Sequence, residues 1–385
     1  MLGLNLCTVF VLILPQLTLV SALVCKGSDC RVIEEFHYVN DERTLLYDPD
    51  LSYKMLLLSA AAYDPVHTQQ CLNNSLPSAK FQLQSVVTRS CDFLDNKCSG
   101  YVAVSHVEKA IVIAFRGSDG SKQILVEILE TLLVPEQHFL NGKVQSYWKR
   151  GFEGLWQCME SKVKSLVLAN PSYQIWVTGH SLGAAMASLT STWLAHYNIA
   201  PRKNIVLYTF GMPRVGDYYY ALQHDQLVIN SWRVVNFDDI VPRLPPLDIV
   251  NIKSGPYHHG MEVFYSVNAV SANSTHRECH GTPHDEDKTC SRNQTIVNLR
   301  QSIERHEKYF SVFVGQFCKT SVDYTGSSGE ELKFLEDRCL TYKYKDGFTV
   351  EETTHGPSSS STTASILLGS FYIICFTLNI YVCFL

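Results

Sequence analysis

The distribution of apolar and polar residues predicts strands alternating with helices along most of the chain. Residues 110–115 form a continuous apolar run, as expected for a strand buried on both faces. A helix is predicted within 42–63, where apolar side chains recur at helical spacing, and a long helix over 143–168. Further strands are predicted over 81–88, 100–106, 173–177, 205–210 and 231–237, and a further helix over 216–226. This alternation favours an α/β fold with a central, largely parallel sheet and helices on both faces.

A sharp turn after the strand at 173–177 carries the clearest chemical signal. It reads Gly179-x-Ser181-x-Gly183 and leads into a helix of small residues. A Cβ at either glycine would clash where a strand turns so abruptly into a helix. Such a turn lifts the hydroxyl of Ser181 clear of the sheet, at the positive end of the helix. The context of strand, turn and helix favours a nucleophile over an incidental serine.

A serine nucleophile needs an acid and a base, which follow it in this kind of fold in the order Ser, Asp or Glu, His. Asp238 and Asp239 come directly after the strand predicted over 231–237, and Asp217 follows an earlier strand. Two adjacent aspartates cannot both face one histidine. The pattern leaves the choice between Asp238 and Asp239 open, with Asp217 as the next candidate.

Periodicity alone does not identify the base. His306 follows an apolar-periodic stretch and precedes Tyr309, which favours a packed helix end. His355 lies in a linker and is discounted. Seven histidines follow Asp239: His258, His259, His276, His280, His284, His306 and His355. Three of these, His276, His280 and His284, share a loop with Cys279 and Cys290, where a disulfide is favoured over a zinc site in an exported chain.

The transition state of acyl transfer needs two donors for its oxyanion. One is expected from the backbone N–H of Leu182, the residue after the nucleophile. The other is expected from Ser118, in the loop after the strand at 110–115, through its backbone and hydroxyl.

Several features predict export through the secretory pathway. Residues 1–22 have the apolar core and small-residue cleavage site of a signal peptide, although without a basic start. Ten cysteines lie between this signal and the tail, which suggests up to five disulfides. Local pairs are expected at Cys25–Cys30, Cys91–Cys98 and Cys279–Cys290. Glycosylation is predicted at Asn73, Asn273 and Asn293.

The C-terminal region departs in composition from the globular part, which is assigned to residues 23–318. A more polar extension covers 319–356, and a Ser/Thr-rich linker covers 357–365. Residues 366–385 are apolar and uncharged, as in a GPI-attachment signal or a membrane span. Either would hold the globular part at the cell surface. The net charge of −5 and the absence of basic runs argue against a nucleic-acid partner.

Five ordered blocks resemble class 3, fungal-type lipases of the α/β-hydrolase fold. They are residues 113–118, 177–184, 209–216, 236–246 and 257–262, within a similarity that covers about 45–315. The resemblance implies that Asp239 is the acid and His306 the base, with Ser118 and Leu182 at the oxyanion hole. Arg305 departs from the family pattern, which often has an acidic residue there, and His258 stays a minor rival to His306.

The resemblance also implies a lid helix over the site, just after the oxyanion loop. The apolar helical stripe there is formed by Ile124, Leu125, Ile128, Leu129 and Leu132. Without the resemblance, the stripe would be interpreted as an ordinary core-facing helix.

The predicted function is triacylglycerol hydrolysis at a lipid surface through Ser181, Asp239 and His306, with no metal or organic cofactor. A phospholipase or a polar-ester esterase is the alternative on the same scaffold. A binding domain on an inactive hydrolase scaffold is more remote, since all three catalytic residue types are present.

Overall fold

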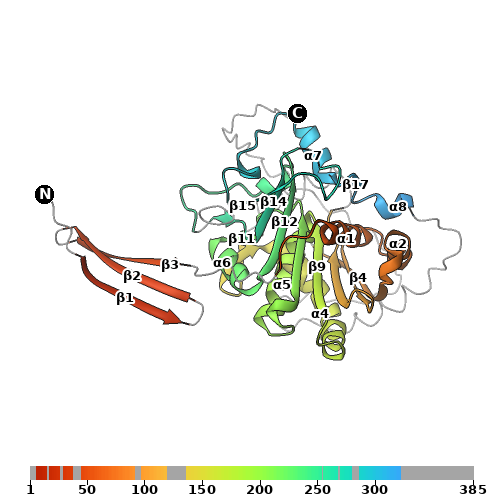
Figure 1. Cartoon of the computed structure of the whole chain (residues 1–385), viewed down its shortest axis with the longest axis horizontal. Coiled ribbons are helices and arrows are strands. Elements are labelled where there is room, and N and C mark those ends of the chain that lie inside the picture. Colours follow the sequence, from red (N-terminus) through yellow and green to blue (C-terminus); the bar gives the residue numbers. More distant parts are fainter. Residues whose placement is uncertain are drawn as a thin grey trace, which may run out of the picture. The chain divides into compact units, whose positions relative to one another are not determined.

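The computed structural model describes residues 6–14, 17–26, 29–37, 45–91, 97–118, 136–253, 255–267, 269–279 and 286–321 (Figure 1). The first three ranges form an antiparallel sheet of their own, of strands β1 (Leu6–Leu14), β2 (Leu17–Lys26) and β3 (Asp29–His37). The signal peptide predicted over 1–22 overlaps β1 and β2, and its cleavage stays a prediction. Cys25 and Cys30 lie opposite each other in the β2–β3 pairing.

An eight-stranded sheet, in the order β15-β14-β12-β10-β9-β6-β5-β4, forms the centre of the main domain. Its five neighbouring strands β14, β12, β10, β9 and β6 run parallel, and antiparallel strands flank them. The bounds are β4 (Gln82–Ser90), β5 (Lys97–Ser105), β6 (Ala110–Phe115), β9 (Gln174–His180), β10 (Ile205–Phe210), β12 (Asn230–Asn236), β14 (Met261–Tyr265) and β15 (Arg277–Cys279). The predicted, largely parallel sheet is confirmed.

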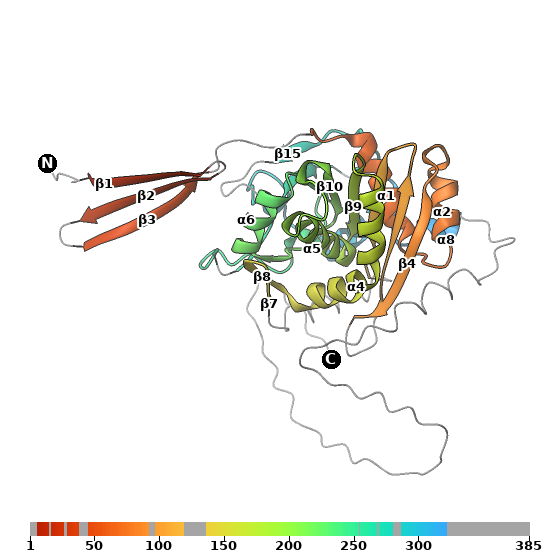
Figure 2. The ribbon, with the colours of Figure 1, turned by 90° about the horizontal axis from the view of Figure 1, so that it is seen from below.

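Helices lie on both faces of this sheet (Figures 1 and 2), and apolar side chains pack between them and the sheet. Along β6, Ile111 and Ile113 pack with the helices of one face, and Val112 and Ala114 pack against the other. Successive side chains of a strand point to opposite faces, so a strand covered on both sides needs the continuous apolar run seen in the sequence. The helices concerned are α4 (Ser146–Ala169) and α5 (Leu182–His196) on one face and α1 (Pro49–Ala61) on the other.

Shorter elements complete the domain. A small sheet has the order β13-β11-β8-β7, and β16 pairs with β17. The bounds are α2 (Thr68–Ser75), β7 (Glu136–Phe139), β8 (Gly142–Gln145), β11 (Gly216–Asp217), α6 (Tyr218–Leu227), β13 (Pro256–Tyr257), α7 (Leu299–Glu307), β16 (Lys308–Tyr309), β17 (Val312–Phe313) and α8 (Phe317–Ser321). Single 3₁₀ turns occur at η1 (Pro77–Ala79), η2 (Arg202–Asn204), η3 (Val241–Arg243) and η4 (Ser291–Asn293).

Two predicted helices are confirmed. Helix α1 lies within the range 42–63 and begins at Pro49, because Asp48 caps it by accepting from the backbone N–H groups of Asp50 and Leu51. Proline at the first helical position has no N–H to leave unpaired. Helix α4 begins at Ser146 rather than at 143, because the preceding residues pair as strand β8.

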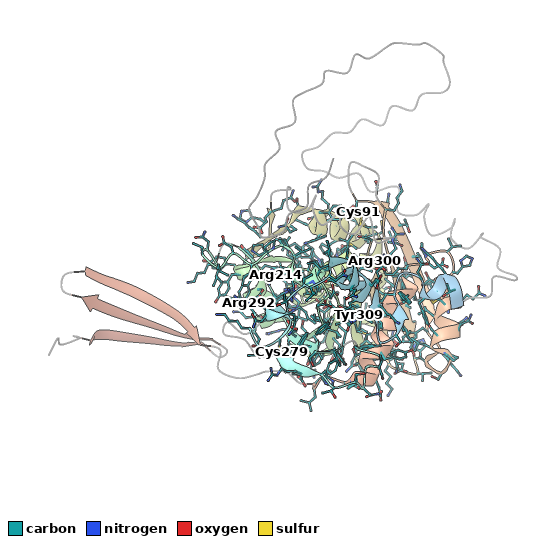
Figure 3. The ribbon with its side chains drawn as sticks, turned by 90° about the horizontal axis from the view of Figure 1, so that it is seen from above. Cys91, Arg214, Cys279, Arg292, Arg300 and Tyr309 are labelled. Atoms are coloured by element: carbon teal, nitrogen blue, oxygen red, sulfur yellow. A yellow bond between two sulfur atoms is a disulfide. The ribbon has the colours of Figure 1, made fainter. Side chains whose placement is uncertain are left out.

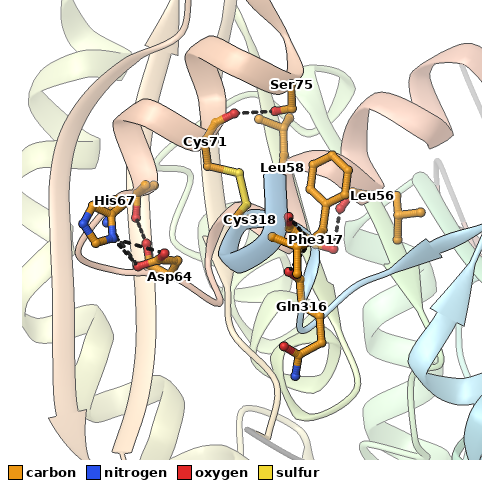
Figure 4. The surroundings of a disulfide bond; sticks show 12 residues. Leu56, Leu58, Asp64, His67, Cys71, Ser75, Gln316, Phe317 and Cys318 are labelled. Atoms are coloured by element: carbon orange, nitrogen blue, oxygen red, sulfur yellow. Dashed lines mark hydrogen bonds and ion pairs between the residues drawn. A yellow bond between two sulfur atoms is a disulfide. The ribbon is translucent and has the colours of Figure 1, made fainter. Parts of the chain in front are cut away.

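Disulfides link parts of the main domain. The predicted pairs Cys91–Cys98 and Cys279–Cys290 are confirmed. A third bond, Cys71–Cys318, joins α2 to α8 across 247 residues of sequence (Figure 4). This bond closes a long loop that contains the central sheet, so it restricts the unfolded chain strongly.

Several predicted features fall outside the described residues. These are the lid stripe within 119–135 and everything after residue 321, which includes most of the extension, the linker and the apolar tail. Within the part that the structure does describe, none of the helices combines the length and apolar character needed to cross a bilayer. The side chains of Asn73, Asn273 and Asn293 are exposed, and their glycosylation stays a prediction.

Candidate active site

Ser181 sits in a strained turn between β9 and α5. Its backbone has φ +59° and ψ −128°, a conformation that residues with a side chain rarely adopt. The turn leaves no room for a side chain at position 179, since a Cβ at Gly179 would collide with the carbonyl group of Gly183. A Cβ at Gly183 would in turn collide with the backbone of Phe115 at the end of β6. Strain of this kind costs about 1–3 kcal/mol and is typical of functional turns.

Asp239 and His306 form a buried pair. The carboxylate Oδ2 of Asp239 lies 3.0 Å from Nδ1 of His306, and both side chains are fully buried. The other oxygen, Oδ1, accepts from the backbone N–H of Val241 at 2.9 Å. Because Nδ1 faces a carboxylate, Nε2 is the ring nitrogen left to exchange a proton. Among the described residues, none forms a hydrogen bond with this Nε2.

A third group also contacts the carboxylate. The hydroxyl of Tyr309, a residue labelled in Figure 3, donates to Oδ2 of Asp239 at 2.6 Å. Burial, and next the nearby Asp239 charge, raise the pKa of Tyr309 well above its usual value. The phenol therefore stays protonated and acts as a donor. The sequence placed Tyr309 beside His306 but did not indicate this contact, because Asp239 and Tyr309 are 70 residues apart in the chain.

The strand end at Phe210 connects this pair to the serine. The backbone N–H of Ser181 donates to the carbonyl of Phe210 at 3.0 Å. The next residue, Gly211, has φ +58°, and a Cβ there would lie 2.7 Å from the His306 ring and 2.9 Å from Oδ2 of Asp239. Only a glycine fits this position. Ser181, His306 and Asp239 thus surround one short segment of backbone.

The alternative acids have other partners. Asp238 forms an ion pair with Arg305, with Oδ1 2.5 Å from Nε. Arg305, where the family pattern often has an acidic residue, also lies over the ring of Phe237 at 4.7 Å. Asp217 caps α6 by accepting from the backbone N–H of Tyr220. Neither aspartate is paired with His306.

The rival histidines are also engaged elsewhere. Nε2 of His258 lies 2.6 Å from the carbonyl of Pro242, and Nε2 of His259 lies 2.7 Å from Oγ of Ser188. His276 contacts the carbonyl of Ser274. His280, His284 and His355 lie outside the described residues.

The loop after Asp239 is held by a buried ion pair. Arg214 binds both carboxylate oxygens of Glu286, at 2.7 and 2.9 Å. The same guanidinium donates to the carbonyls of Arg243 and Pro245. Pairing and hydrogen bonding together satisfy a buried charge that would otherwise be costly. The segment that follows Asp239 is therefore held through the carbonyls of Arg243 and Pro245.

The expected oxyanion donors lie next to the serine. Leu182 is the first residue of α5, where backbone N–H groups have no partner within the helix. Ser118 is 8% exposed and follows Gly117, at which a Cβ would lie 3.0 Å from Cβ of Ser181. The loop after β6 thus packs directly on the turn that carries Ser181.

One cluster of metal-ligand types occurs in the described part of the chain. Glu262, Cys279 and Cys290 have ligand atoms within 4.8 Å of one another. The two sulfurs are joined in a disulfide and offer no thiolate. The disulfide, which was predicted for this loop, links the end of β15 to the residue before η4.

Known lipases resemble the chain in sequence. The family "Lipase (class 3)" matches residues 112–249. A lipase from Caenorhabditis elegans is 35% identical over 299 residues, covering 72% of this chain and 83% of that protein. The secreted mono- and diacylglycerol lipase A of Penicillium cyclopium is 30% identical over 209 residues, covering 51% of this chain and 65% of that protein.

Solved lipase structures resemble the fold. Lipase II from Rhizopus niveus superposes with a TM-score of 0.58 at 27% identity, over 69% of this chain and 94% of that one. A triacylglycerol lipase described as having a serine protease triad at its catalytic centre gives a TM-score of 0.57 at 27% identity, over 71% and 98%. The predicted α/β-hydrolase fold is confirmed.

Proposed function

We propose that this chain, which belongs to the class 3 lipase family and is a serine ester hydrolase, hydrolyses acylglycerols through Ser181, Asp239 and His306. One observation carries the assignment of these residues. The buried His306–Asp239 pair packs on Gly211, and the adjacent Phe210 carbonyl accepts from the backbone of Ser181. A histidine oriented by a carboxylate beside a strained serine is the arrangement that activates a hydroxyl.

The reaction follows from these contacts. Nε2 of His306 takes the proton of the Ser181 hydroxyl as Oγ attacks the ester carbonyl carbon. Asp239 holds the imidazole through Nδ1 and stabilises the imidazolium that forms. His306 then returns the proton to the departing alcohol, and the C–O bond of the ester breaks. Water attacks the acyl-enzyme by the same route, which releases the fatty acid and restores Ser181.

The oxyanion forms while the carbonyl carbon is tetrahedral. We assign its two donors to the backbone N–H of Leu182 and to Ser118. The N-terminus of α5 adds a favourable positive potential at this point. Losing one such donor typically costs about 3 kcal/mol in the transition state.

The substrate class is supported by relatives and by sequence. The Penicillium relative is a mono- and diacylglycerol lipase, and it is secreted. The apolar stripe over 124–132 fits a lid that opens on a lipid surface. We extend the proposal to an extracellular enzyme held at the cell surface by its apolar tail.

Hydrolysis of emulsified tributyrin by Ser181→Ala tests the proposal. We expect a loss of at least about 10⁴-fold in kcat, since a triad that lacks its nucleophile retains little activity. Ser191→Ala is the matched control, because this buried serine lies on the same helix and donates to the backbone carbonyl of Ser188. Parent-like hydrolysis by Ser181→Ala would overturn the triad assignment.

A substrate panel on the parent enzyme tests the substrate class. Emulsified triacylglycerol, phosphatidylcholine vesicles and a soluble p-nitrophenyl ester are compared at equal enzyme concentration. We expect the highest kcat/KM on the acylglycerol emulsion. A preference for phosphatidylcholine or for the soluble ester would replace the acylglycerol assignment with a phospholipase or an esterase.

A further inference from the structure

The histidine that precedes the nucleophile has no part in the reaction described above, although both of its ring nitrogens are engaged. His180 ends β9 and is 3% exposed. Its Nε2 lies 2.7 Å from the backbone carbonyl oxygen of His306, and its Nδ1 lies 2.7 Å from the hydroxyl of Tyr63. A carbonyl oxygen can only accept, so Nε2 carries the proton. Nδ1 is then the acceptor for the Tyr63 hydroxyl, and the tautomer is fixed.

This contact satisfies a group that the helix itself leaves open. His306 lies in the last turn of α7, which ends at Glu307. Carbonyls in the last turn of a helix have no partner within the helix. The donor from His180 therefore holds the main chain of His306, while Asp239 holds its side chain. The base is fixed at two points.

The two rings also lie against each other. The centroids of His180 and His306 are 4.6 Å apart, with an angle of 29° between the rings. Burial, and next the proximity of His306, lower the pKa of His180 well below its usual value. His180 thus stays neutral while His306 becomes an imidazolium during catalysis. A charged neighbour at this distance would oppose that step.

The other end of the contact reaches the oxyanion loop. Tyr63 follows α1 and is buried, and its hydroxyl occupies the space that a Cβ of Gly117 would need. The same position at Gly117 lies 2.6 Å from the carbonyl oxygen of His180 and 3.0 Å from Cβ of Ser181. Tyr63 therefore touches the loop that carries Ser118 and also binds His180.

We infer that His180 and Tyr63 are positioning residues, which together set the main chain of His306 against Ser181 and the oxyanion loop. The inference rests on the proposed triad. Neither residue touches substrate; they act through His306 and Gly117. Their substitution should misplace the base by a fraction of an ångström and leave substrate binding largely intact.

Two sets of variants test this with a soluble p-nitrophenyl ester, so that adsorption to lipid does not enter. His180→Leu removes both hydrogen bonds, and His180→Gln keeps an amide donor near the position of Nε2. Tyr63→Phe removes a single oxygen. Turnover is expressed per active site, titrated with a fluorophosphonate, so that misfolded molecules are not counted.

The matched controls are buried groups away from the site. His259→Leu removes a fully buried histidine that is bonded to Ser188. Tyr101→Phe removes a buried hydroxyl that donates to the carbonyl of Leu58 at 2.7 Å. Both should lower stability and leave turnover per site within about twofold, a factor worth about 0.4 kcal/mol.

We expect His180→Leu to lower kcat by on the order of 10- to 100-fold with little change in KM, as for a small misplacement of a catalytic group. Tyr63→Phe should lower kcat less, and His180→Gln should recover most of the activity lost in the leucine variant. Parent-like kcat in both Tyr63→Phe and His180→Leu would overturn the inference. A glutamine variant no better than leucine would also overturn it.

The experiments distinguish a failure of the triad assignment from a failure of the positioning role. If Ser181→Ala hydrolyses the ester as the parent does, the proposed function fails before His180 is considered. If Ser181→Ala is inactive and the His180 and Tyr63 variants behave like their controls, only the positioning role fails. Should His180→Leu not fold, Tyr63→Phe against Tyr101→Phe decides the matter alone.

Discussion

Among the individual residues of the site, Asp239 has hydrogen-bond partners on both of its carboxylate oxygens. Asp239 uses Oδ1 for the backbone of Val241 and Oδ2 for both His306 and Tyr309. Each bond to a buried carboxylate is a charge-assisted one, worth more than a neutral hydrogen bond. The carboxylate therefore cannot rotate freely, and its contact with Nδ1 fixes the orientation of the His306 imidazole.

Tyr309→Phe tests this restraint. Removing the donor to Oδ2 should destabilise the fold by about 1.5–3 kcal/mol, as for a hydrogen bond to a charged group. It should also lower kcat by about tenfold with an unchanged KM, because Asp239 then holds His306 less firmly. Urea unfolding and ester hydrolysis give the two values.

The matched variant is Tyr265→Phe, which removes a buried hydroxyl that donates to the carbonyl of Ala272 at 2.6 Å. It should affect stability alone. If Tyr309→Phe changes kcat no more than Tyr265→Phe does, the restraint on Asp239 has no catalytic role.

Some of the site residues could be predicted from the sequence, and others could not. The strained turn made Ser181 recognisable from spacing alone. The acid and base were chosen through the family resemblance, because position after a strand left both Asp238 and Asp239 open. Tyr63 and His180 were not identified, since their contact joins positions 117 residues apart and neither residue type signals it.

At the scale of elements, a buried polar network joins α5, α6 and β12. His224 on α6 lies 2.8 Å from Oγ1 of Thr192 through Nδ1 and 3.0 Å from Oγ of Ser231 through Nε2. The ring of His259 lies beside it, tilted by 48°, with the two ring centroids 4.0 Å apart. Burial lowers the pKa of His224 to about 3, so the network holds a neutral imidazole.

This network makes stability depend on pH. An unfolded histidine has a pKa of about 6.5, and the folded value is about 3. The unfolded state therefore binds the proton first, and the stability present above pH 6.5 is lost as the pH falls toward 3. The slope is about 1.4 kcal/mol per pH unit for one proton.

His224→Gln should lower that slope by one proton between about pH 6 and pH 4. Urea unfolding at a series of pH values measures it. Thr190→Ala is the control, because Thr190 is a buried residue of α5 that donates to the carbonyl of Met186 and carries no proton that titrates in this range, so its substitution should leave the slope unchanged. Equal slopes in the parent and His224→Gln would show that His224 is not held neutral.

Element prediction succeeded where the apolar pattern was continuous and failed where it was short. Strands such as β6 and β10 are buried on both faces and were recognised from unbroken apolar runs. The pairing of β7 with β8 was missed, because four-residue strands carry too little periodicity. Helix α1 lies within its predicted range, and its first residue is set by the Asp48 cap and Pro49 rather than by the apolar pattern.

At the scale of the whole molecule, the fold gathers distant segments around one turn. Ser181 and Asp239 follow β9 and β12, His306 lies in the last turn of α7, and Cys71–Cys318 ties α2 to the segment that comes after His306 (Figure 4). A parallel sheet brings the carboxyl ends of its strands to one edge, where such sites form. The architecture could therefore be predicted, whereas the contacts that Tyr309 and His180 make around His306 could not.

Labelling of the purified protein with a fluorophosphonate, followed by mass spectrometry of the digested chain, tests most sharply the claim that Ser181 is the nucleophile of an active ester hydrolase. We predict one phosphonate, on the peptide that contains Ser181, with labelling abolished in Ser181→Ala and strongly slowed in His306→Gln. An unlabelled parent, or a label on another serine that persists in Ser181→Ala, would contradict the claim.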